Sequence, residues 1–566
     1  MIRADNTKAN RIRIFFLFFL FLGAFAYIIF KLVSIQYISA DKYKIQAEYQ
    51  YKDSFSLKSR RGKIFDRNGI ELASSIIEKT ITANPKLIKD PVKASEDLAK
   101  ILLIDKDELT QKLSDKNIGF LYIARKIDSS EADKIADLNL EGIYIEDESK
   151  RYYPQNDLAS TLIGFTGTDN IGLTGLELKY EDILRGIDGT VSAQKDVFGQ
   201  IIQTNSENYS PPVDGGDIIL TIDSQIQYYA QKKLKEVAEK YKSEKAIAVL
   251  MNPQTGEIYA LAQYPTFDLN KYADVDPKNY NNLGVSFVYE PGSTFKIVNI
   301  SSALENKRVN TSQVFHLAPS IKVGDRVIKE IYRTYGVDYQ LKDIIKYSSN
   351  IGAVTVALSM GNKLYYESMI KYGLGNYSGI NIPGEEKGLI ADYKTWPASS
   401  IGAMAIGQGI AVTPIQLIRA VSVIANGGYL ITPSVVSETK SADGTIDREL
   451  SGESTQIIST QTAQEVKDMM LSVVEDGTGT GTLARIEGVK VCGKTGTAQK
   501  ANKNSPGYDE GLVVTSFVGF APYENPKIAC IVIIDEPKGN EAEIWGGTVA
   551  APVFSDLVNF ALNKIH

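Results

Sequence analysis

An uninterrupted apolar run near the N-terminus places the tightest limit on how this chain can fold. The run extends from Ile14 to Phe30, and it lengthens further if the Lys31 ammonium group reaches a membrane interface. Four cationic residues precede it: Arg3, Lys8, Arg11 and Arg13. Because positive charge is retained on the cytoplasmic side, the sequence predicts a cytoplasmic N-terminus at residues 1–13 and a transmembrane anchor at residues 14–36.

A cleaved signal peptide is the alternative to this anchor. Ala24-Phe25-Ala26 has the small residues of a cleavage site. The apolar run continues well beyond this tripeptide, which favours an uncleaved anchor. In both cases the bulk of the protein is exported, and the anchored form is a single-pass protein of the cytoplasmic membrane.

Length and composition indicate a globular chain behind the anchor. With 566 residues, 43% apolar and 23% charged, the chain can form two or three domains with a large core. A net charge of −6 and a pI of about 5.4 argue against nucleic acid as a partner.

Histidine and cysteine are scarce, which restricts the possible chemistry. His316 and His566 lie in no recognisable motif, so we expect neither a Ser-His-Asp triad nor a histidine-ligated metal site. Cys492 and Cys530 are too few for a disulfide scaffold and lie in apolar strand patterns, which indicates buried free thiols. A serine enzyme built from this chain needs a lysine base. We expect no cofactor and no metal.

The first exported segment, residues 37–214, has mixed α and β patterns. Asn68-Gly69 is a turn signal after a short strand pattern, and residues 91–140 show helical periodicity. A glycine-rich section between Gly164 and Glu177 is typical of a tight corner, and it lacks the lysine of a phosphate-binding loop. Proline and glycine pairs mark a domain boundary close to residue 214.

The second segment, residues 215–566, predicts an α+β fold. A helix capped by Asp223 is followed by a hairpin, and three further strand patterns lie near the C-terminus. The expected strands are Ala246–Met251, Glu257–Ala262, Val489–Thr497, Val513–Phe520 and Ile528–Asp535. Strands at both ends with helices between them suggest a central antiparallel sheet, flanked by helices and closed by the domain's own termini.

A serine and a lysine three residues apart form the candidate catalytic pair. Pro291-Gly292 interrupts the preceding chain, and an apolar helical pattern follows, so Ser293 is expected to cap a helix that carries Lys296 on the same face. A helix N-terminus and burial both favour a neutral amine. Such an environment makes serine a nucleophile and lysine its base.

This S-x-x-K pattern is weak alone, because it also begins at Ser39, Ser192, Ser368 and Ser437. Two further motifs strengthen it: Ser348-Ser349-Asn350, and Lys494-Thr495-Gly496, which occurs once in the chain. The three motifs in this order match the S-x-x-K, S-D-N and K-T-G set of β-lactamases and penicillin-binding proteins, with S-S-N here in place of S-D-N.

The chain resembles the class B penicillin-binding proteins over essentially its whole length. Besides the three motifs, the stretches that carry the resemblance are Arg61-Gly62, Asp66-Arg67-Asn68-Gly69, Gly175-Leu176-Glu177, Met404–Gly409, Thr413–Gln416 and Ala425–Gly428. The resemblance implies a membrane anchor, a non-catalytic pedestal of the dimerisation type at residues 37–214, and a penicillin-binding transpeptidase domain. It implies cross-linking of peptidoglycan stem peptides ending in D-Ala-D-Ala, and binding of β-lactams.

The resemblance also implies a role for each motif residue. Ser293 would form an acyl-enzyme with Lys296 as base, Ser348 would relay a proton, and Asn350 would bind the lysine and the substrate amide. Backbone N–H groups of Ser293 and Thr497 would hold the oxyanion. The substrate carboxylate would be held by Lys494, Thr495, Gly496 and Thr497. Helix capping for Ser348 and Asn350, and β-propensity for the two threonines, are the alternative explanations.

Several details remain open. The S-S-N triplet and residues 383–414 are similar to the division-specific (septal) group, whereas the elongation group usually carries an acidic middle residue in this triplet. A septal enzyme would dock on a polytopic glycan polymerase of the SEDS family and on other division proteins. An elongation-type transpeptidase, a D,D-carboxypeptidase, a β-lactamase and a β-lactam sensor are the alternatives. The segment from Ile328 to Tyr339 is less familiar than the rest.

Overall fold

The computed structural model describes residues 5–44, 52–195, 201–331, 333–449, 453–502, 507–540 and 543–565. Arg3 and His566 therefore lie outside the described residues. The chain forms two compact units, one of Met1–Ser59 with Ile187–Asp214 and one of Arg60–Gly186 with Gly215–His566.

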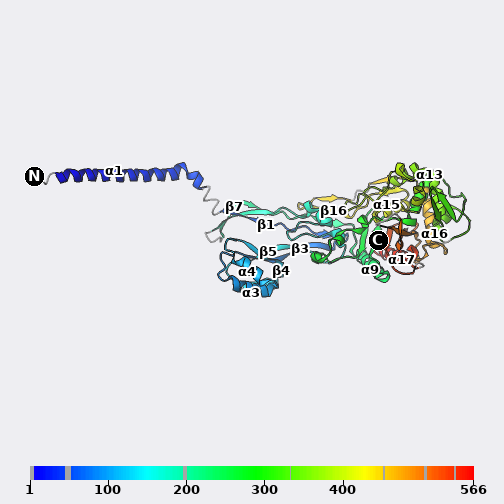
Figure 1. Ribbon diagram of the computed structural model, residues 1–566, viewed down its shortest axis with the longest axis horizontal. Helices are drawn as coiled ribbons and strands as arrows, with labels where there is room; N and C mark the ends of the chain where they lie inside the picture. Colours follow the sequence, from blue (N-terminus) through cyan, green and yellow to red (C-terminus); the bar gives the residue numbers. More distant parts are fainter. Residues whose placement is uncertain are drawn as a thin grey trace. The chain divides into compact units, whose positions relative to one another are not determined.

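The first unit contains a long apolar helix and a small sheet. Helix α1 spans Asp5–Val33 and continues into a π-helical turn, Ser34–Ile38 (Figure 1). Its phenylalanine, leucine and isoleucine side chains are exposed, and the segment Lys8–Ile38 is long and apolar enough to cross a membrane. A signal sequence near an N-terminus has the same properties. The sheet pairs three antiparallel strands, β1 (Lys52–Leu57), β6 (Gly189–Lys195) and β7 (Ile201–Ser210).

The second unit begins with a seven-stranded sheet in the order β17-β16-β8-β2-β3-β4, with β5 paired to β3. Its strands are β2 (Ile64–Phe65), β3 (Glu71–Ala83), β4 (Leu121–Ile127), β5 (Ile143–Tyr152), β8 (Asp217–Leu220), β16 (Val436–Lys440) and β17 (Ile446–Arg448). Strands from both sides of residue 214 thus share this sheet. The predicted limits of the pedestal and catalytic domains stay a prediction.

Short helices complete this part of the unit. They are α3 (Pro91–Leu102), α4 (Lys106–Ser114), α5 (Ser129–Asp137), α6 (Ser160–Ile163), α7 (Gly175–Lys179) and α8 (Glu181–Leu184). The helical prediction for residues 91–140 is confirmed for α3, α4 and α5, but it missed β4, whose side chains are mostly half-buried and show no clean alternation. Around Leu98 and Leu113 these helices and the sheet form a separate small core.

A buried ion cluster links the Arg61 and Glu177 stretches that the sequence singled out. The Glu177 carboxylate accepts hydrogen bonds from Arg61 Nε and Arg151 Nε, each at 2.6 Å. Arg151 also donates to the Gly62 carbonyl at 2.6 Å, and all three charged side chains are almost fully buried. Because two cations share one carboxylate, the cluster links the segment before β2 to β5 and α7.

The other part of the second unit is built on a five-stranded antiparallel sheet in the order β10-β9-β21-β20-β19. The strands are β9 (Lys245–Met251), β10 (Ile258–Tyr264), β19 (Cys492–Ala501), β20 (Tyr508–Ala521) and β21 (Ile528–Asp535). Pairing of β9 with β21 closes the sheet between the start and the end of this part, so the α+β prediction is confirmed. Cys492 and Cys530 are free and buried in these strands, as predicted.

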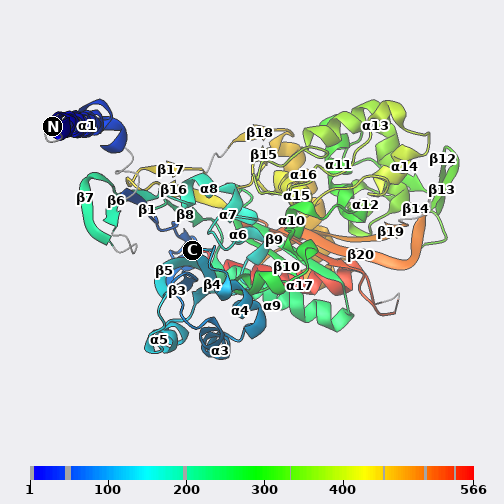
Figure 2. The ribbon, with the colours of Figure 1, turned by 60° about the vertical axis from the view of Figure 1, so that its left-hand side comes forward.

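Helices cover both faces of this sheet (Figure 2). Helices α9 (Ser224–Tyr241) and α17 (Gly546–Leu562) pack together on one face, and α15 (Pro414–Ala425) and α16 (Thr460–Glu475) lie on the other. Asp223 caps α9 by accepting from the backbone N–H groups of Gln225 and Ile226, which confirms its predicted role.

The same part contains further helices, turns and short strands, of which η4 packs against the edge strand β19. The helices are α10 (Leu283–Ser286), α11 (Lys296–Glu305), α12 (Leu341–Lys346), α13 (Asn350–Lys371) and α14 (Ser400–Ala405). The 3₁₀ turns are η2 (Leu269–Asp274), η3 (Pro277–Tyr280), η4 (Gly292–Phe295), η5 (Tyr393–Thr395) and η6 (Thr482–Ala484). The short strands are β11 (Phe315–Leu317), β12 (Ser320–Val323), β13 (Arg326–Lys329), β14 (Val337–Tyr339), β15 (Tyr429–Ile431) and β18 (Ser454–Gln456).

Replacing Glu177 should destabilise the second unit strongly. Glu177→Gln leaves the buried Arg151 guanidinium without its counter-charge and Arg61 with Glu181 alone, and we expect a loss of about 3–5 kcal/mol of unfolding free energy. The melting temperature of the detergent-solubilised protein measures it. The matched control is Glu96→Gln, which removes an exposed carboxylate paired with Lys100 within α3 and should leave the melting temperature unchanged. Equal melting temperatures for both variants would contradict a structural role for the cluster.

Candidate active site

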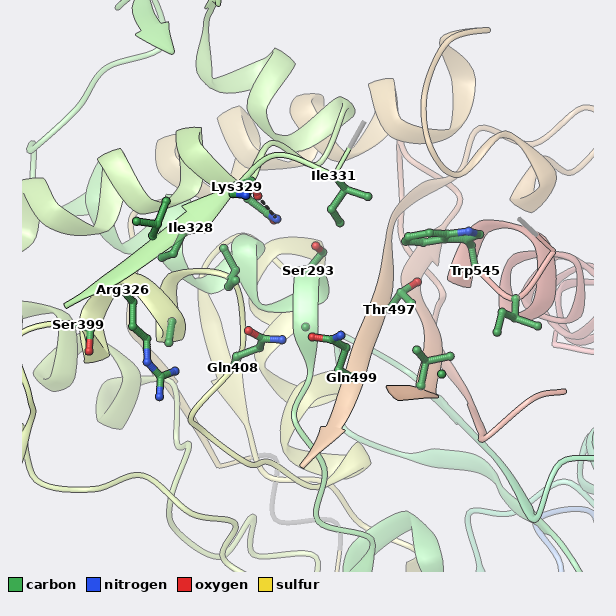
Figure 3. A pocket seen from close by; sticks show the side chains of 18 residues that line it. Ser293, Arg326, Ile328, Lys329, Ile331, Ser399, Gln408, Thr497, Gln499 and Trp545 are labelled. Carbon is green, nitrogen blue, oxygen red and sulfur yellow. Dashed lines mark hydrogen bonds between the residues drawn. The ribbon is translucent and has the colours of Figure 1, made fainter. Parts of the chain in front are cut away.

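Ser293 lies in the 3₁₀ turn η4, which runs directly into helix α11. The prediction of a helix start at this point is confirmed, but the expectation that Ser293 caps it is wrong. Pro291 already has helical dihedral angles, φ −71° and ψ −15°, and no side chain caps either η4 or α11. A capping side chain needs an extended residue at the cap, and the continuous turn provides none. The half-buried Ser293 hydroxyl points into a cavity (Figure 3).

The turn is held close to two other segments by glycine. Gly292 has a φ of 57° and donates its N–H to the Gly407 carbonyl at 3.0 Å. A Cβ atom on Gly407 would lie 2.0 Å from the Gly292 carbonyl oxygen, and one on Gly496 would lie 2.9 Å from the Thr294 side chain. Only residues without a side chain allow this approach of η4 to the Met404–Gly409 stretch and to β19.

The S-S-N triplet spans the start of α13: Ser348 and Ser349 precede the helix, and Asn350 is its first residue. Ser349 is the N-cap of α13, and its hydroxyl accepts from Gly352 N at 3.0 Å. Ser348 has a φ of 58°, an unfavourable value for a residue other than glycine. Its Oγ lies 3.3 Å from Lys296 Nζ and 2.8 Å from Lys494 Nζ. The helix cap is therefore Ser349, and Ser348 instead contacts both lysines.

The two lysines are fully buried around Ser348. Lys296 Nζ donates to the Ser348 carbonyl at 2.7 Å and to Asn350 Oδ1 at 2.8 Å. Lys494, on β19, donates to Ser348 Oγ and to the Thr495 carbonyl at 3.1 Å. Among the described residues, no hydrogen bond joins Lys296 to the Ser293 hydroxyl, although the sequence placed the two side chains on one helix face.

Burial makes both amines more acidic. Desolvation lowers the pKa of Lys296 to about 7, although the negative charge of Glu330 partly opposes this shift. Desolvation also lowers the pKa of Lys494 far below its ordinary value, and the nearby Lys296 charge adds to this effect. Near neutral pH a substantial part of the Lys296 amine is therefore uncharged and able to accept a proton.

The other S-x-x-K matches lack this environment. Lys42, Lys371 and Lys440 are exposed, and the Ser368 hydroxyl is used within α13 by donating to the Leu364 carbonyl. The side chains of Ser192 and Lys195 lie outside the described part of the structure. Of the described pairs, only Ser293 with Lys296 combines a serine in a cavity with a fully buried lysine.

Strand β19 brings the K-T-G triplet to the edge of the sheet beside η4. Thr495 Oγ1 donates to Thr480 Oγ1 at 3.1 Å, and Thr497 Oγ1 accepts from Gly546 N at 3.1 Å. The structure thus brings together all the predicted site residues: Ser293, Lys296, Ser348, Asn350, Lys494, Thr495, Gly496 and Thr497. His316 is exposed, pairs with Asp338 and lines neither of the cavities at Ser293.

Glu330 is a member of the site that sequence reasoning missed. Its carboxylate accepts from Ser349 Oγ at 2.5 Å and from Ile351 N at 3.0 Å, and it pairs with Arg333 at 3.1 Å. It thereby holds the start of α13 in place. It lies in the segment Ile328 to Tyr339 that the sequence could not interpret, and a carboxylate 19 residues before its partner produces no periodic signal.

Two cavities meet at the Ser293 hydroxyl. One has a volume of about 530 Å³ and lies along β13; Figure 3 shows the side chains that line it. The other has a volume of about 630 Å³ and is lined by Ser348 and Thr495. Residues that line both are Ser293, Ile331, Thr497 and Trp545. The Ser293 hydroxyl is thus accessible from two directions.

Comparisons with known proteins agree with this geometry. Residues 246–559 match the penicillin binding protein transpeptidase domain, and residues 56–220 match the penicillin-binding protein dimerisation domain. Stage V sporulation protein D of Bacillus subtilis is 34% identical, over 100% of this chain and 87% of its own. The peptidoglycan D,D-transpeptidase FtsI of Escherichia coli is 30% identical, over 96% and 90%. Penicillin binding protein 3 of Mycobacterium tuberculosis, solved with aztreonam, superposes with a TM-score of 0.71 at 25% identity, over 90% and 97%.

A buried lysine pair, an S-S-N triplet and an edge-strand K-T-G around one serine define a serine-type penicillin-binding transpeptidase. The chain belongs to the class B penicillin-binding proteins, and its enzymatic class is that of the peptidoglycan D,D-transpeptidases. The predicted family and enzyme class are confirmed.

The acidity of Lys296 can be measured directly. In protein labelled with lysine carrying ¹³C at Cε, we expect one resonance, absent from Lys296→Arg, to titrate with a midpoint of about 7. The Glu330→Gln variant removes the charge that raises this pKa, so the midpoint should move to lower pH. Glu367→Gln, which changes an exposed carboxylate on α13, should leave it unmoved. A midpoint near the ordinary lysine value of about 10.4 would contradict the burial argument.

Proposed function

We propose that this protein cross-links peptidoglycan stem peptides through a covalent acyl intermediate on Ser293. The observation that carries the proposal is the contact of two buried lysines with Ser348 beside a serine that opens into two cavities. A neutral amine, a relaying hydroxyl and an exposed nucleophile are the parts that acyl transfer without histidine requires.

The first half-reaction acylates the enzyme. Ser293 Oγ attacks the carbonyl carbon of the penultimate D-alanine, and the neutral Lys296 amine takes the hydroxyl proton. The peptide bond to the terminal D-alanine breaks, and its nitrogen receives a proton through Ser348, which lies 3.3 Å from Lys296 Nζ. In the second half-reaction an amine of another stem peptide attacks the ester. Its proton passes back through the lysine, and the serine hydroxyl is restored.

The substrate carboxylate brings a negative charge next to Lys494 in the proposed mechanism. Lys494 with Thr495, Gly496 and Thr497 forms the proposed carboxylate site, because hydrogen bonds to an ionised group are strong. A bound carboxylate favours the ammonium form of Lys494 and reverses part of its pKa depression. Backbone N–H groups of Ser293 and Thr497 serve as the oxyanion donors, and one such donor is typically worth about 10²–10³ in rate. Asn350 orients Lys296 and the substrate amide.

A β-lactam presents a strained carbonyl and a carboxylate in a similar arrangement, so we extend the proposal to acylation of Ser293 by β-lactams. The solved relative from Mycobacterium tuberculosis in complex with aztreonam supports this extension. Water as acceptor would make the same acyl-enzyme a D,D-carboxypeptidase or a β-lactamase, and a stable acyl-enzyme would suit a β-lactam sensor. The mechanism as proposed needs no metal and no cofactor.

Penicillin should label Ser293 and no other serine. In the full-length protein in detergent, Ser293→Ala should abolish labelling, and Lys296→Arg should reduce it almost as far, because arginine stays protonated in proteins. Peptide mass spectrometry after incubation with labelled penicillin measures both. Ser368→Ala, which alters a buried S-x-x-K serine in α13, is the matched control and should label normally. Label on another serine, or near-native labelling of Lys296→Arg, would contradict the mechanism.

The arrangement in the cell is also part of the proposal. Residues 14–36 form an uncleaved anchor with residues 1–13 in the cytoplasm, and residues 37–214 form a pedestal for the catalytic domain of residues 215–566. The apolar helix and the match to a dimerisation domain support this division. The anchor and pedestal would dock on a SEDS-family glycan polymerase and on division proteins, because the enzyme needs glycan strands delivered to its site.

Depletion of the protein in its host should reveal the process it serves. We propose septal wall synthesis, on the likeness of the S-S-N segment to the division group, and expect filamentous cells without septa under the microscope. Rounded cells that still divide would assign the protein to elongation. The 34% identity to a sporulation protein over the whole chain supports a second candidate. Normal growth with defective spores would favour that role.

A further inference from the structure

The cavity along β13, which we name the β13 cavity, differs in charge from the protein as a whole. Arg326 and Lys329 both line it, and no carboxylate lines it among the residues the structure describes. The whole chain carries a net charge of −6, so this local excess of positive charge runs against the composition. Gln408 and Gln499 contribute neutral amide groups to the same cavity.

The Arg326 side chain is available for a ligand. It is exposed, and in the described part of the chain it makes no hydrogen bond and no ion pair. The neighbouring Asp325 carboxylate hydrogen-bonds to Ser399 and also interacts electrostatically with Arg326, without forming an ion pair. Figure 3 shows Arg326, Gln408 and Gln499 along one side of the cavity, with the Ser293 hydroxyl above them in this view. Apolar side chains, among them Ile328, Ile406 and Ile544, line the remainder.

The two cavities indicate the direction in which the donor peptide runs through the site, and this argument rests on the proposed function. The terminal carboxylate binds beside Thr495, which lines the larger cavity with Ser348. The scissile carbonyl lies at Ser293, which both cavities share. The part of the donor peptide that precedes D-Ala-D-Ala must therefore leave Ser293 in the other direction, into the β13 cavity.

We propose that the β13 cavity is a subsite for a second carboxylate of the donor stem peptide, with Arg326 as its principal partner. A planar guanidinium binds a carboxylate through two parallel hydrogen bonds, a geometry that lysine and amides do not match. Gln408 and Gln499 can add amide donors, and Lys329 adds positive charge to the cavity. The apolar residues suit the alkyl part of a long side chain.

Two positions of a stem peptide can supply this carboxylate. One is the residue before D-Ala-D-Ala when it is diaminopimelate, and the other is the free α-carboxylate of a γ-linked D-glutamate one position earlier. Both present the same group, and amidation of either removes its charge. The subsite would therefore make the enzyme sensitive to amidation of its own substrate.

The test uses the full-length protein in detergent and synthetic donors ending in D-alanyl-D-lactate, which form the same acyl-enzyme. In the first set of donors, the residue before D-alanyl-D-lactate is diaminopimelate, its amide or lysine. In the second set, the residue one position earlier is γ-linked D-glutamate or its α-amide. The rate of Ser293 acylation is measured by competition with a fluorescent penicillin whose side chain is uncharged.

We expect the acid form to react about 10-fold faster than the amide at one of the two positions, which identifies the source of the carboxylate. Arg326→Gln should reduce this advantage to about 2-fold or less by slowing the acid form alone. Lys322→Gln removes an exposed cation from β12 of the same hairpin, outside the cavity, and should keep the full advantage.

Equal rates for acid and amide at both positions in the native protein would overturn the subsite. An equal slowing of both forms by Arg326→Gln would also overturn it, because that pattern reports a structural role. If Arg326→Gln does not react even with penicillin, the variant is uninformative about the subsite. The ratio of acid to amide acylation rates in the native protein then tests the proposal alone. A native protein that penicillin does not label would refute the proposed function itself, whereas labelling without discrimination refutes only the subsite.

Discussion

The burial of two lysine amines around one serine hydroxyl is the constraint on which the rest of the site depends. Lys296 and Lys494 are both inaccessible to solvent, and Ser348 Oγ lies within hydrogen-bond distance of both. Desolvation lowers the pKa of Lys296 to about 7, and it also lowers the pKa of Lys494, to which the nearby charge of Lys296 contributes. The site therefore contains a base at physiological pH without histidine.

Several costly features of the structure maintain this arrangement. Ser348 adopts a left-handed backbone conformation that serine ordinarily avoids, and Gly292 and Gly407 approach each other more closely than any Cβ atom would allow. The Glu330 carboxylate accepts hydrogen bonds from the Ser349 hydroxyl and from backbone N–H groups at the start of α13. Strain concentrated at one place is typical of a preorganised site, which the five-stranded sheet and its helices are large enough to support.

Two basic side chains near Ser293 differ in burial. Lys494 is fully buried, and desolvation lowers its pKa far below its ordinary value. Arg326 is exposed and lines the β13 cavity. Under the proposed function, both side chains bind carboxylates of the donor peptide.

The sequence by itself determined many of the elements and the enzyme class. Local periodicity predicted α9 and most of the catalytic sheet, and the three motifs named every predicted site residue, because residue type and spacing are local properties. Only the tertiary structure decided which residue caps α13, that Lys296 contacts Ser348 and Asn350, and that Glu330 belongs to the site. These contacts join segments far apart in the chain. Their distances and the resulting pKa shifts exist only once packing has excluded water, which no local pattern encodes.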